Sequence, residues 1–334
     1  MAQAHPTKAH MALVELMNQG YLKHIISQNT DGLHRKSGIP ADKISEVHGN
    51  RNKEECKKCG YEYMRDFAVR NAKGTKEHKT GRFCDDPKCR GPLTDTIINF
   101  GENLREDILD MGYAHGVEAD LMVCVGSSMR VNPAADMAGQ TAERGGNLVI
   151  INLMKTPLDP YASLVINGKC QVVFELLMKK LSIAIPEWNI KRSAKVFLET
   201  EKATGKELLK IQGVDTNDRS YDYLKTVGIN KQNGSKVVLK ATEQNKDSVY
   251  KLNLGFQGHY KEPSLELDIP RALLLEGKNA IKVDMIYNPR TCKWEFVMSY
   301  DFYNKNDLDI VSFKNGGGKA GNDLAKAMDK KLKL

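Results

Sequence analysis

Three short apolar segments, each ending in small polar residues, constrain the fold of this chain more than any other feature. Runs of this kind that alternate with helices are typical of parallel strands covered on both faces. We therefore predict an α/β fold with a Rossmann-like parallel sheet. The predicted strands are 24–27, 120–125 and 147–151, and the predicted helices are 7–19, 133–144 and 172–181.

Polar loops follow all three predicted strands. Gln28–Gly32 comes after the first strand, Gly126–Ser128 after the second and Asn152 after the third. In parallel sheets, ligands bind outside the carboxyl ends of the strands. We expect a nucleotide to bind over these loops.

His48 lies before a glycine in a short loop, after a predicted strand at 44–47. A neutral imidazole can accept a proton near pH 7. The amides of Gln28 and Asn29 and the carboxylate of Asp31 suit amide and hydroxyl partners. On residue type alone, a loop histidine is more often structural than catalytic, so both interpretations stay open.

Four cysteines lie in an inserted segment at about 50–96, which is charged and poor in aliphatic residues. Cys56 and Cys59 form one closely spaced pair, and Cys84 and Cys89 form the other. Such pairs suit tetrahedral Zn²⁺, with four thiolates at about 2.3 Å from the metal. Four thiolates leave no position open for water, so the predicted zinc is structural, one ion per chain. Free thiols or a redox pair are the alternative.

The composition changes near residue 190, which predicts a second domain. We expect residues 1–190 to form the first domain, residues 191–314 a β-rich accessory domain, and residues 315–334 a glycine-rich linker with a basic helix. Strands are expected at 236–241, 248–256, 264–269, 280–287 and 293–303, with a turn at 288–290.

The net charge of +8 is concentrated in the second half, where residues 191–334 hold 26 Lys and Arg against 19 Asp and Glu. A basic domain favours polyanionic partners, and a solvated lysine-rich surface is the alternative. No apolar run approaches the roughly 20 residues that span a bilayer, and residues 1–10 lack a secretory signal pattern. We expect no membrane contact and a reducing compartment.

Together these motifs resemble the sirtuin family, the NAD-dependent protein deacylases. The resemblance covers about residues 2–188. Segments such as Thr80-Gly81-Arg82 and Asp95-Thr96-Ile97 are most similar to the class IV branch of nuclear, chromatin-linked sirtuins. The family motifs matched are Gln28-Asn29-x-Asp31-Gly32-Leu33-His34, Glu46-Val47-His48-Gly49, the four cysteines, Phe100-Gly101-Glu102, Gly126-Ser127-Ser128 and Ile151-Asn152.

The resemblance implies an enzyme, an NAD-dependent protein-lysine deacetylase of the nucleus that acts on histone tails or other chromatin proteins. It implies that His48 is the general base on a ribose hydroxyl, while the acyl oxygen attacks the ribose carbon that nicotinamide leaves. The NAD-binding residues that it implies are Gln28, Asn29, Asp31, Gly126, Ser127, Ser128, Asn152 and the backbone at Cys170. The acyl-lysine peptide is then held by Phe100, Gly101, Glu102, Val131 and Asn132.

Members of the family begin with a strand and a glycine-rich loop of the form G-A-G-x-S, which holds the NAD phosphates. This sequence starts after that loop, so we expect weakened NAD binding. A shortened reading of the gene and a weakened or inactive paralogue are the two explanations. The competing functions are a catalytically inactive zinc-containing scaffold and a mono-ADP-ribosyltransferase.

Overall fold

The computed structural model divides into two compact units, Met1–Trp188 and Asn189–Leu334. It describes residues 4–71, 74, 77–200, 207–215, 219–221, 223–229, 232–234, 249–271, 274, 281–300 and 313–314. The predicted strand at 236–241 and the predicted linker and basic helix at 315–334 lie outside the described residues. Every helix in the described part of the chain is too short or too polar to cross a membrane.

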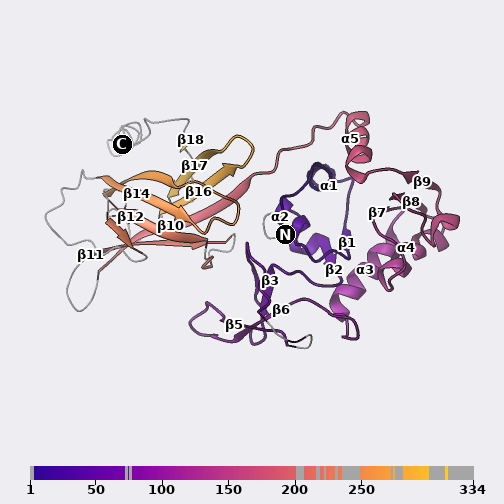
Figure 1. Ribbon diagram of the computed structural model, residues 1–334, viewed down its shortest axis with the longest axis horizontal. Helices are drawn as coiled ribbons and strands as arrows, with labels where there is room; N and C mark the ends of the chain where they lie inside the picture. Colours follow the sequence, from indigo (N-terminus) through magenta and orange to yellow (C-terminus); the bar gives the residue numbers. More distant parts are fainter. Residues whose placement is uncertain are drawn as a thin grey trace, which may run out of the picture. The chain divides into compact units, whose positions relative to one another are not determined.

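The first unit is mixed α/β (Figure 1). Its helices are α1 (Lys8–Asn18), α2 (Leu33–Ser37), α3 (Glu106–Glu118), α4 (Ala134–Glu143) and α5 (Cys170–Lys180), with short 3-10 turns at Ala41–Lys43 and Asp159–Tyr161. Its strands are β1 (Ile25–Ser27), β2 (Ile44–Glu46), β3 (Lys53–Cys56), β4 (Glu62–Met64), β5 (Lys79–Phe83), β6 (Pro92–Asp95), β7 (Leu121–Val125), β8 (Asn147–Asn152) and β9 (Leu164–Asn167).

The predicted parallel strands are confirmed, and they form two hydrogen-bonded groups. β1 pairs in parallel with β2, and β7, β8 and β9 form a parallel sheet in that order. The predicted helices at 7–19, 133–144 and 172–181 correspond to α1, α4 and α5. The parallel α/β architecture is therefore confirmed, with α2, α3 and β9 as elements of it that the sequence analysis did not predict.

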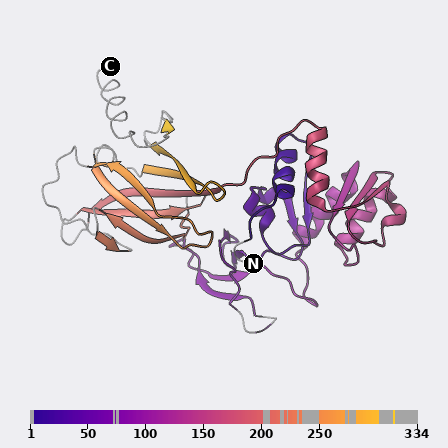
Figure 2. The same cartoon turned by 45° about the horizontal axis from the view of Figure 1, so that its top comes forward.

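One face of the β7–β9 sheet is covered by α4. Cys124 of β7 and Leu148 and Ile150 of β8 are buried against Ala135 and Ala138 of the helix. Figure 2 shows α1 and α5 side by side, and buried residues of both helices form a second apolar cluster. Val125, the last residue of β7, packs against that cluster.

Burial on both faces, which we expected for these strands, is wrong for β7. Leu121 is 52% exposed and Val123 is 41% exposed. Successive strand residues point to opposite faces, so these two side chains project away from α4. The α1–α5 cluster reaches that second face at Val125.

The inserted segment forms a four-stranded antiparallel sheet in the order β4-β3-β6-β5 (Figure 1). A buried ion network occupies much of its interior. The Glu54 carboxylate is fully buried and accepts hydrogen bonds from the Nε atoms of Arg65 and Arg82 at 2.8 and 2.7 Å. Two cationic partners offset the cost of burying one carboxylate where few aliphatic side chains are available.

The second unit consists of two antiparallel sheets, of order β11-β10-β16-β17-β18 and β13-β12-β14-β15. Alternate residues of β14, β15 and β16 are buried, and residues of both sheets share one apolar core. The bounds are β10 (Ile190–Thr200), β11 (Glu207–Val214), β12 (Leu224–Ile229), β13 (Gln232–Gly234), β14 (Val249–Phe256), β15 (Leu265–Pro270), β16 (Ile281–Asn288), β17 (Lys293–Tyr300) and β18 (Phe313–Lys314).

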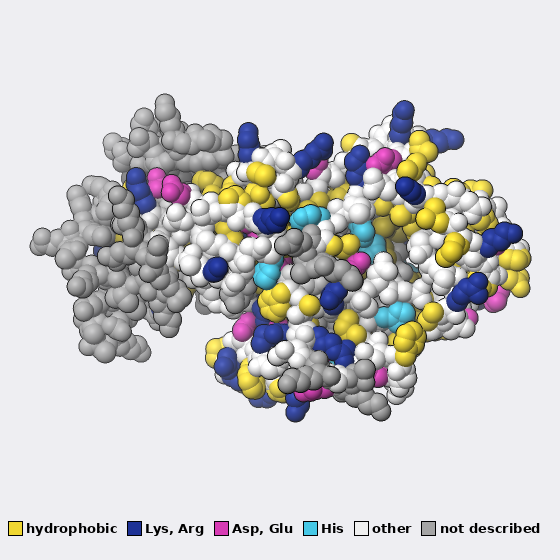
Figure 3. All heavy atoms as spheres, in the orientation of Figure 1, with side chains coloured by type: hydrophobic (Ala, Val, Ile, Leu, Met, Phe, Trp, Pro, Cys, Tyr) yellow, Lys and Arg dark blue, Asp and Glu magenta, His cyan; other side chains and the backbone are white. Residues whose placement is uncertain are grey.

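Four of the five strands predicted for this unit lie among the described residues and are confirmed there. The segments at 248–256, 264–269, 280–287 and 293–303 correspond to β14–β17, and the turn at 288–290 joins β16 to β17. The sequence analysis missed β10, β11 and β12. In the view of Figure 3, Lys and Arg side chains of the described residues lie at several separate places on the surface.

An ion pair is buried at the start of the second unit. The guanidinium of Arg192 and the carboxylate of Glu262 have side chains 4% and 1% exposed, with Nη2 to Oε1 at 2.6 Å. The rings of Tyr221, Tyr223 and Tyr260 surround the same guanidinium. The pair joins β10 to the loop before β15.

We predict that Glu262→Ala lowers the free energy of unfolding of the second unit by about 3 kcal/mol, because the buried guanidinium loses its carboxylate. Urea unfolding of the full chain measures the change. Glu266→Ala, at an exposed position of β15, is the matched control and should leave the midpoint unchanged. Equal midpoints for the two variants would contradict the role of the pair.

Candidate functional site

The loops at the carboxyl ends of β1, β7 and β8 are tied together by side-chain hydrogen bonds. The Ser127 hydroxyl donates to Gln28 Oε1 at 2.7 Å. The Asn152 amide donates to the Ser127 carbonyl at 3.0 Å. The Gln28 amide donates to the Val131 carbonyl at 3.3 Å. The structure therefore brings Gln28, Ser127 and Asn152 together, as the polar loops predicted.

The other predicted cofactor residues lie along the same loops. Asn29, Gly126 and Ser128 are exposed, and Asp31 is half-buried. Asp31 Oδ1 accepts the backbone N–H of Leu33 at 3.0 Å, so this carboxylate also caps the first turn of α2. Gly126 has φ of +63°, a conformation that side-chain-bearing residues rarely adopt, which explains glycine directly after β7.

Cys170 lies at the same edge of the sheet, three residues beyond the end of β9. Asn167 of β9 is in register with Asn152 of β8, so both strands end at the same level. Cys170 is half-buried and is the first residue of α5. Its backbone is therefore placed near the carboxyl ends of the parallel strands.

His48 follows β2 and contacts the β1 loop. Its Nδ1 lies 3.1 Å from the Gln28 carbonyl oxygen. A carbonyl can only accept, so Nδ1 carries the hydrogen and the lone pair is on Nε2. The backbone of Gln28 thus selects the tautomer that leaves Nε2 basic.

A close backbone contact holds the His48 loop. Gly49 has φ of +77°, and a Cβ atom there would overlap the carbonyl oxygen of Thr96. The Thr96 hydroxyl donates to the Asn50 carbonyl, and the Ile98 N–H donates to the His48 carbonyl at 3.2 Å. The segment that follows β6 is therefore fixed directly beside His48.

Both predicted peptide-binding segments are anchored to these residues. Phe100, Gly101 and Glu102 come two residues after the Ile98 contact with His48, and Phe100 is 99% exposed. Val131 accepts the Gln28 amide and precedes Asn132, which is exposed at the start of α4. One segment is linked to His48 and the other to Gln28.

The four cysteine sulfurs of the inserted sheet lie within 4.8 Å of one another. The Sγ atoms of Cys56 and Cys89 are 3.5 Å apart, and those of Cys59 and Cys84 are 3.8 Å apart. Tetrahedral zinc thiolates have sulfurs separated by about 3.8 Å, so the cluster fits this ion. A Cβ on Gly91 would lie 2.7 Å from Cys56 Sγ, which explains glycine beside the cluster.

The sequence analysis assigned no role to three residues that hold the site. Hydrogen bonds between Asn50 and Thr96 connect the His48 loop to the end of β6, and His78 contacts Glu102. Thr96 belongs to the segment Asp95-Thr96-Ile97, and its similarity to the class IV branch was the one sequence signal for any of these three residues. Nothing in the pattern around His78 indicates that it reaches Glu102, because the fold brings them together.

Comparisons with known proteins were made on sequence and on structure. Residues 1–133 match the model of the Sir2 family. The chain is 43% identical over 186 residues to NAD-dependent protein deacetylase SRT1 of Arabidopsis thaliana, covering 56% of this chain and 39% of that protein. It is 37% identical over 191 residues to NAD-dependent protein deacetylase Sirt6 of Drosophila melanogaster, covering 56% of this chain and 60% of that protein.

Among solved structures, one described as Sir2 bound to acetylated peptide is 33% identical, with a TM-score of 0.45, covering 55% of this chain and 74% of the other. The chain spans 39% and 60% of the length of the two curated relatives named above. The sequence similarity therefore concerns part of this chain and part of each relative.

We predict that Cys56→Ser lowers the zinc content below one ion per chain and destabilises the first unit, because a hydroxyl replaces one of four thiolates. Metal analysis and thermal unfolding measure both effects. Cys292→Ser, at an exposed cysteine of the second unit, is the control and should retain the metal. Full zinc content and unchanged stability in Cys56→Ser would refute the metal site.

We predict that Gly49→Ala destabilises the first unit by more than 2 kcal/mol, since the new Cβ must displace the Thr96 backbone and the residue has a left-handed φ. Gly20→Ala is a matched control, with φ of +78° and nothing within 4 Å of the new Cβ. A loss for Gly49→Ala no larger than for Gly20→Ala would show that the close contact is unimportant.

Proposed function

The chain belongs to the Sir2 family through its N-terminal part, and from that premise we propose that it catalyses NAD-dependent removal of acyl groups from protein lysine side chains. The observation that supports this most strongly is the contact between His48 Nδ1 and the Gln28 carbonyl. In the neutral form of the imidazole, this contact leaves the lone pair on Nε2, beside the loops proposed for NAD. A basic nitrogen in this position is what general-base catalysis requires.

In this proposal His48 Nε2 accepts the proton of a ribose hydroxyl. Bound NAD supplies a ribose carbon from which nicotinamide leaves when the acyl oxygen of the substrate attacks. The Gln28 carbonyl holds the neutral imidazole in one tautomer before the proton moves, and it stabilises the imidazolium afterwards because Nδ1 continues to donate. The acyl carbon then bonds to the deprotonated ribose hydroxyl, and a water molecule supplies the oxygen and protons with which the lysine amine and an O-acyl-ADP-ribose are released.

We propose that NAD lies over the loops joined by Gln28, Ser127 and Asn152. The small residues after β7 let a nucleotide approach the backbone closely, since Gly126 and Ser128 are exposed and carry little bulk. Asn29 and Asp31 contribute polar groups on the nicotinamide side of the same edge. The backbone at Cys170 closes the adenine end of the site.

The acyl-lysine peptide is proposed to bind as an added strand between Phe100–Glu102 and Val131–Asn132. Backbone hydrogen bonds provide affinity in this mode and demand little sequence specificity. Phe100 is almost fully exposed, so it offers an aromatic surface to an extended peptide. The contacts of these segments with His48 and Gln28 support a peptide position beside the proposed base and the proposed cofactor site.

We propose further that the substrates are histone tails or other chromatin proteins and that the protein acts in the nucleus. Strand addition tolerates the basic sequences of histone tails, because it reads mainly the backbone. The excess of Lys and Arg in residues 191–334 favours association with nucleic acid. A fluorescent fusion that stays outside the nucleus would refute the location.

We predict that His48→Gln lowers kcat for NAD-dependent deacetylation of an acetyl-lysine peptide by about 100- to 10,000-fold, because no side chain then accepts the ribose proton. Nicotinamide release and mass spectrometry of the peptide provide the measurement. His259→Gln in the second unit is the matched control and should retain wild-type rates. NAD affinity, measured by calorimetry, should change little in either variant.

Each competing function has its own outcome in this experiment. Measurable turnover that survives His48→Gln would refute the assigned base. A wild-type chain that binds no NAD would support a catalytically inactive scaffold. Nicotinamide release with ADP-ribose attached to protein, and no loss of acetyl groups, would indicate mono-ADP-ribosyl transfer.

A further inference from the structure

His78 lies between two carboxylates at the edge of the inserted sheet. Its Nδ1 is 3.1 Å from Oδ1 of Asp95, and its Nε2 is 3.1 Å from Oε1 of Glu102. A carboxylate only accepts hydrogen bonds, so both ring nitrogens must carry hydrogens to make the two contacts. The geometry thus describes an imidazolium that bridges β6 to the loop of Phe100.

The Asp95 end of this bridge is rigid. Its side chain is completely buried, and Oδ1 also accepts the Ile97 N–H at 3.0 Å. The Asp95 N–H donates to the His78 carbonyl at 2.8 Å, so backbone and side chain hold the same pair of residues together. Arg70 is the other charged group near this carboxylate, with Nε 3.9 Å from Oδ2.

The Glu102 end closes the loop. Oε2 accepts both the backbone N–H and the side-chain amide of Asn99, at 2.8 and 2.9 Å, and the Glu102 N–H donates back to the Asn99 carbonyl. Phe100 and Gly101 lie within this closed turn, and Gly101 has φ of +86°. Glu102 therefore holds the loop closed through Oε2 and contacts His78 through Oε1.

The charges agree with this geometry. Burial by itself lowers the pKa of His78, but the hydrogen bonds that its ring donates to Asp95 and Glu102 raise that pKa above its usual value. Hydrogen bonds from the Asn99 backbone and from His78 lower the pKa of Glu102 to about 2. Glu102 is therefore charged near neutral pH, and His78, with its raised pKa, is the member of the bridge whose charge changes as the pH increases.

We propose that His78 is a positioning residue that holds the Asn99–Glu102 loop in the shape that binds the acyl-lysine peptide. The inference rests on the proposed deacylase function and extends it to a residue outside the site. The expected effect of losing His78 is confined to peptide binding. Loss of the bridge should weaken peptide binding, whereas NAD binding and the chemical step at saturating peptide should be preserved.

A pH dependence follows from the same bridge. The two-sided contact is complete below the ordinary histidine pKa of about 6.5 and is lost as the pH rises through the raised pKa of folded His78. Among the residues that the structure describes, the charged groups paired with His78 are Asp95 and Glu102, with Arg70 behind Asp95. We expect the peptide KM of the wild type to rise with pH across this titration.

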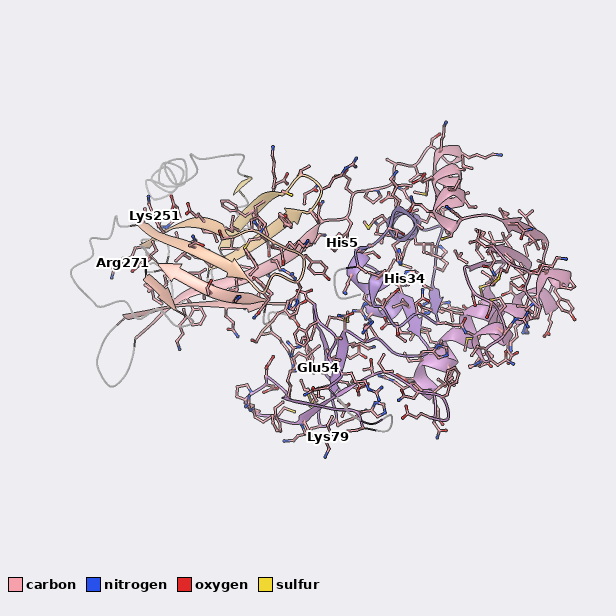
Figure 4. All side chains as sticks on the ribbon, viewed as in Figure 1. His5, His34, Glu54, Lys79, Lys251 and Arg271 are labelled. Atoms are coloured by element: carbon pink, nitrogen blue, oxygen red, sulfur yellow. The ribbon has the colours of Figure 1, made fainter. Side chains whose placement is uncertain are left out.

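The experiment measures kcat and KM of the full chain for an acetyl-lysine peptide and for NAD, from pH 6 to 9. We expect His78→Ala to raise the peptide KM about tenfold at pH 6.5, with kcat and the NAD KM within twofold of wild type. His78→Gln keeps one donor and should show a smaller rise without the pH dependence. Lys79→Ala is the matched control, because this neighbouring side chain is exposed and extends away from the sheet (Figure 4).

The outcomes separate this inference from the proposed function. A wild-type chain that removes no acetyl groups refutes both. An active wild type whose peptide KM is unchanged in both His78 variants refutes the positioning role alone. A loss of kcat, or of thermal stability without a change in peptide KM, would show that His78 is merely structural.

Discussion

The contact of Gly49 with Thr96 is the constraint on which the arrangement of the first unit depends. A glycine with left-handed φ lets the backbone after His48 approach the backbone after β6 more closely than any side chain permits. Through this contact the inserted antiparallel sheet, which has little apolar core, is fixed to the parallel strands. Ile98, directly before the Phe100 loop, donates a backbone hydrogen bond to the His48 carbonyl, so the proposed peptide-binding loop begins beside the proposed base.

The sequence predicted the parts of the fold that local pattern determines. The apolar strands β1, β7 and β8 end in small polar loops, and the cysteine pairs have the spacing of a metal site, so both features were visible. β10 and β11 were missed because charged residues such as Lys191, Arg192 and Lys195 interrupt their apolar pattern. The exposure of Leu121 and Val123 was also missed, because an apolar sequence does not specify which faces receive a covering helix.

The sequence predicted many residues of the candidate site but few of the contacts that hold them together. Gln28, Ser127 and Asn152 could be grouped because each follows a parallel strand. The bridge from Asp95 through His78 to Glu102 could not, since its members come from three segments that meet only after the sheet has formed. Resemblance to a family identifies residues of a motif, whereas the groups that hold those residues in place emerge from packing.

Gln28 uses both ends of its side chain and its backbone at once. The amide oxygen accepts from Ser127, the amide nitrogen donates to Val131, and the carbonyl sets the tautomer of His48. Glutamate at this position could not donate to a carbonyl, and lysine could not accept from a hydroxyl. A side chain of the same size with one atom changed would therefore lose one of the two side-chain contacts to the segment after β7, which makes the amide itself, rather than its bulk or polarity, the property that this position demands.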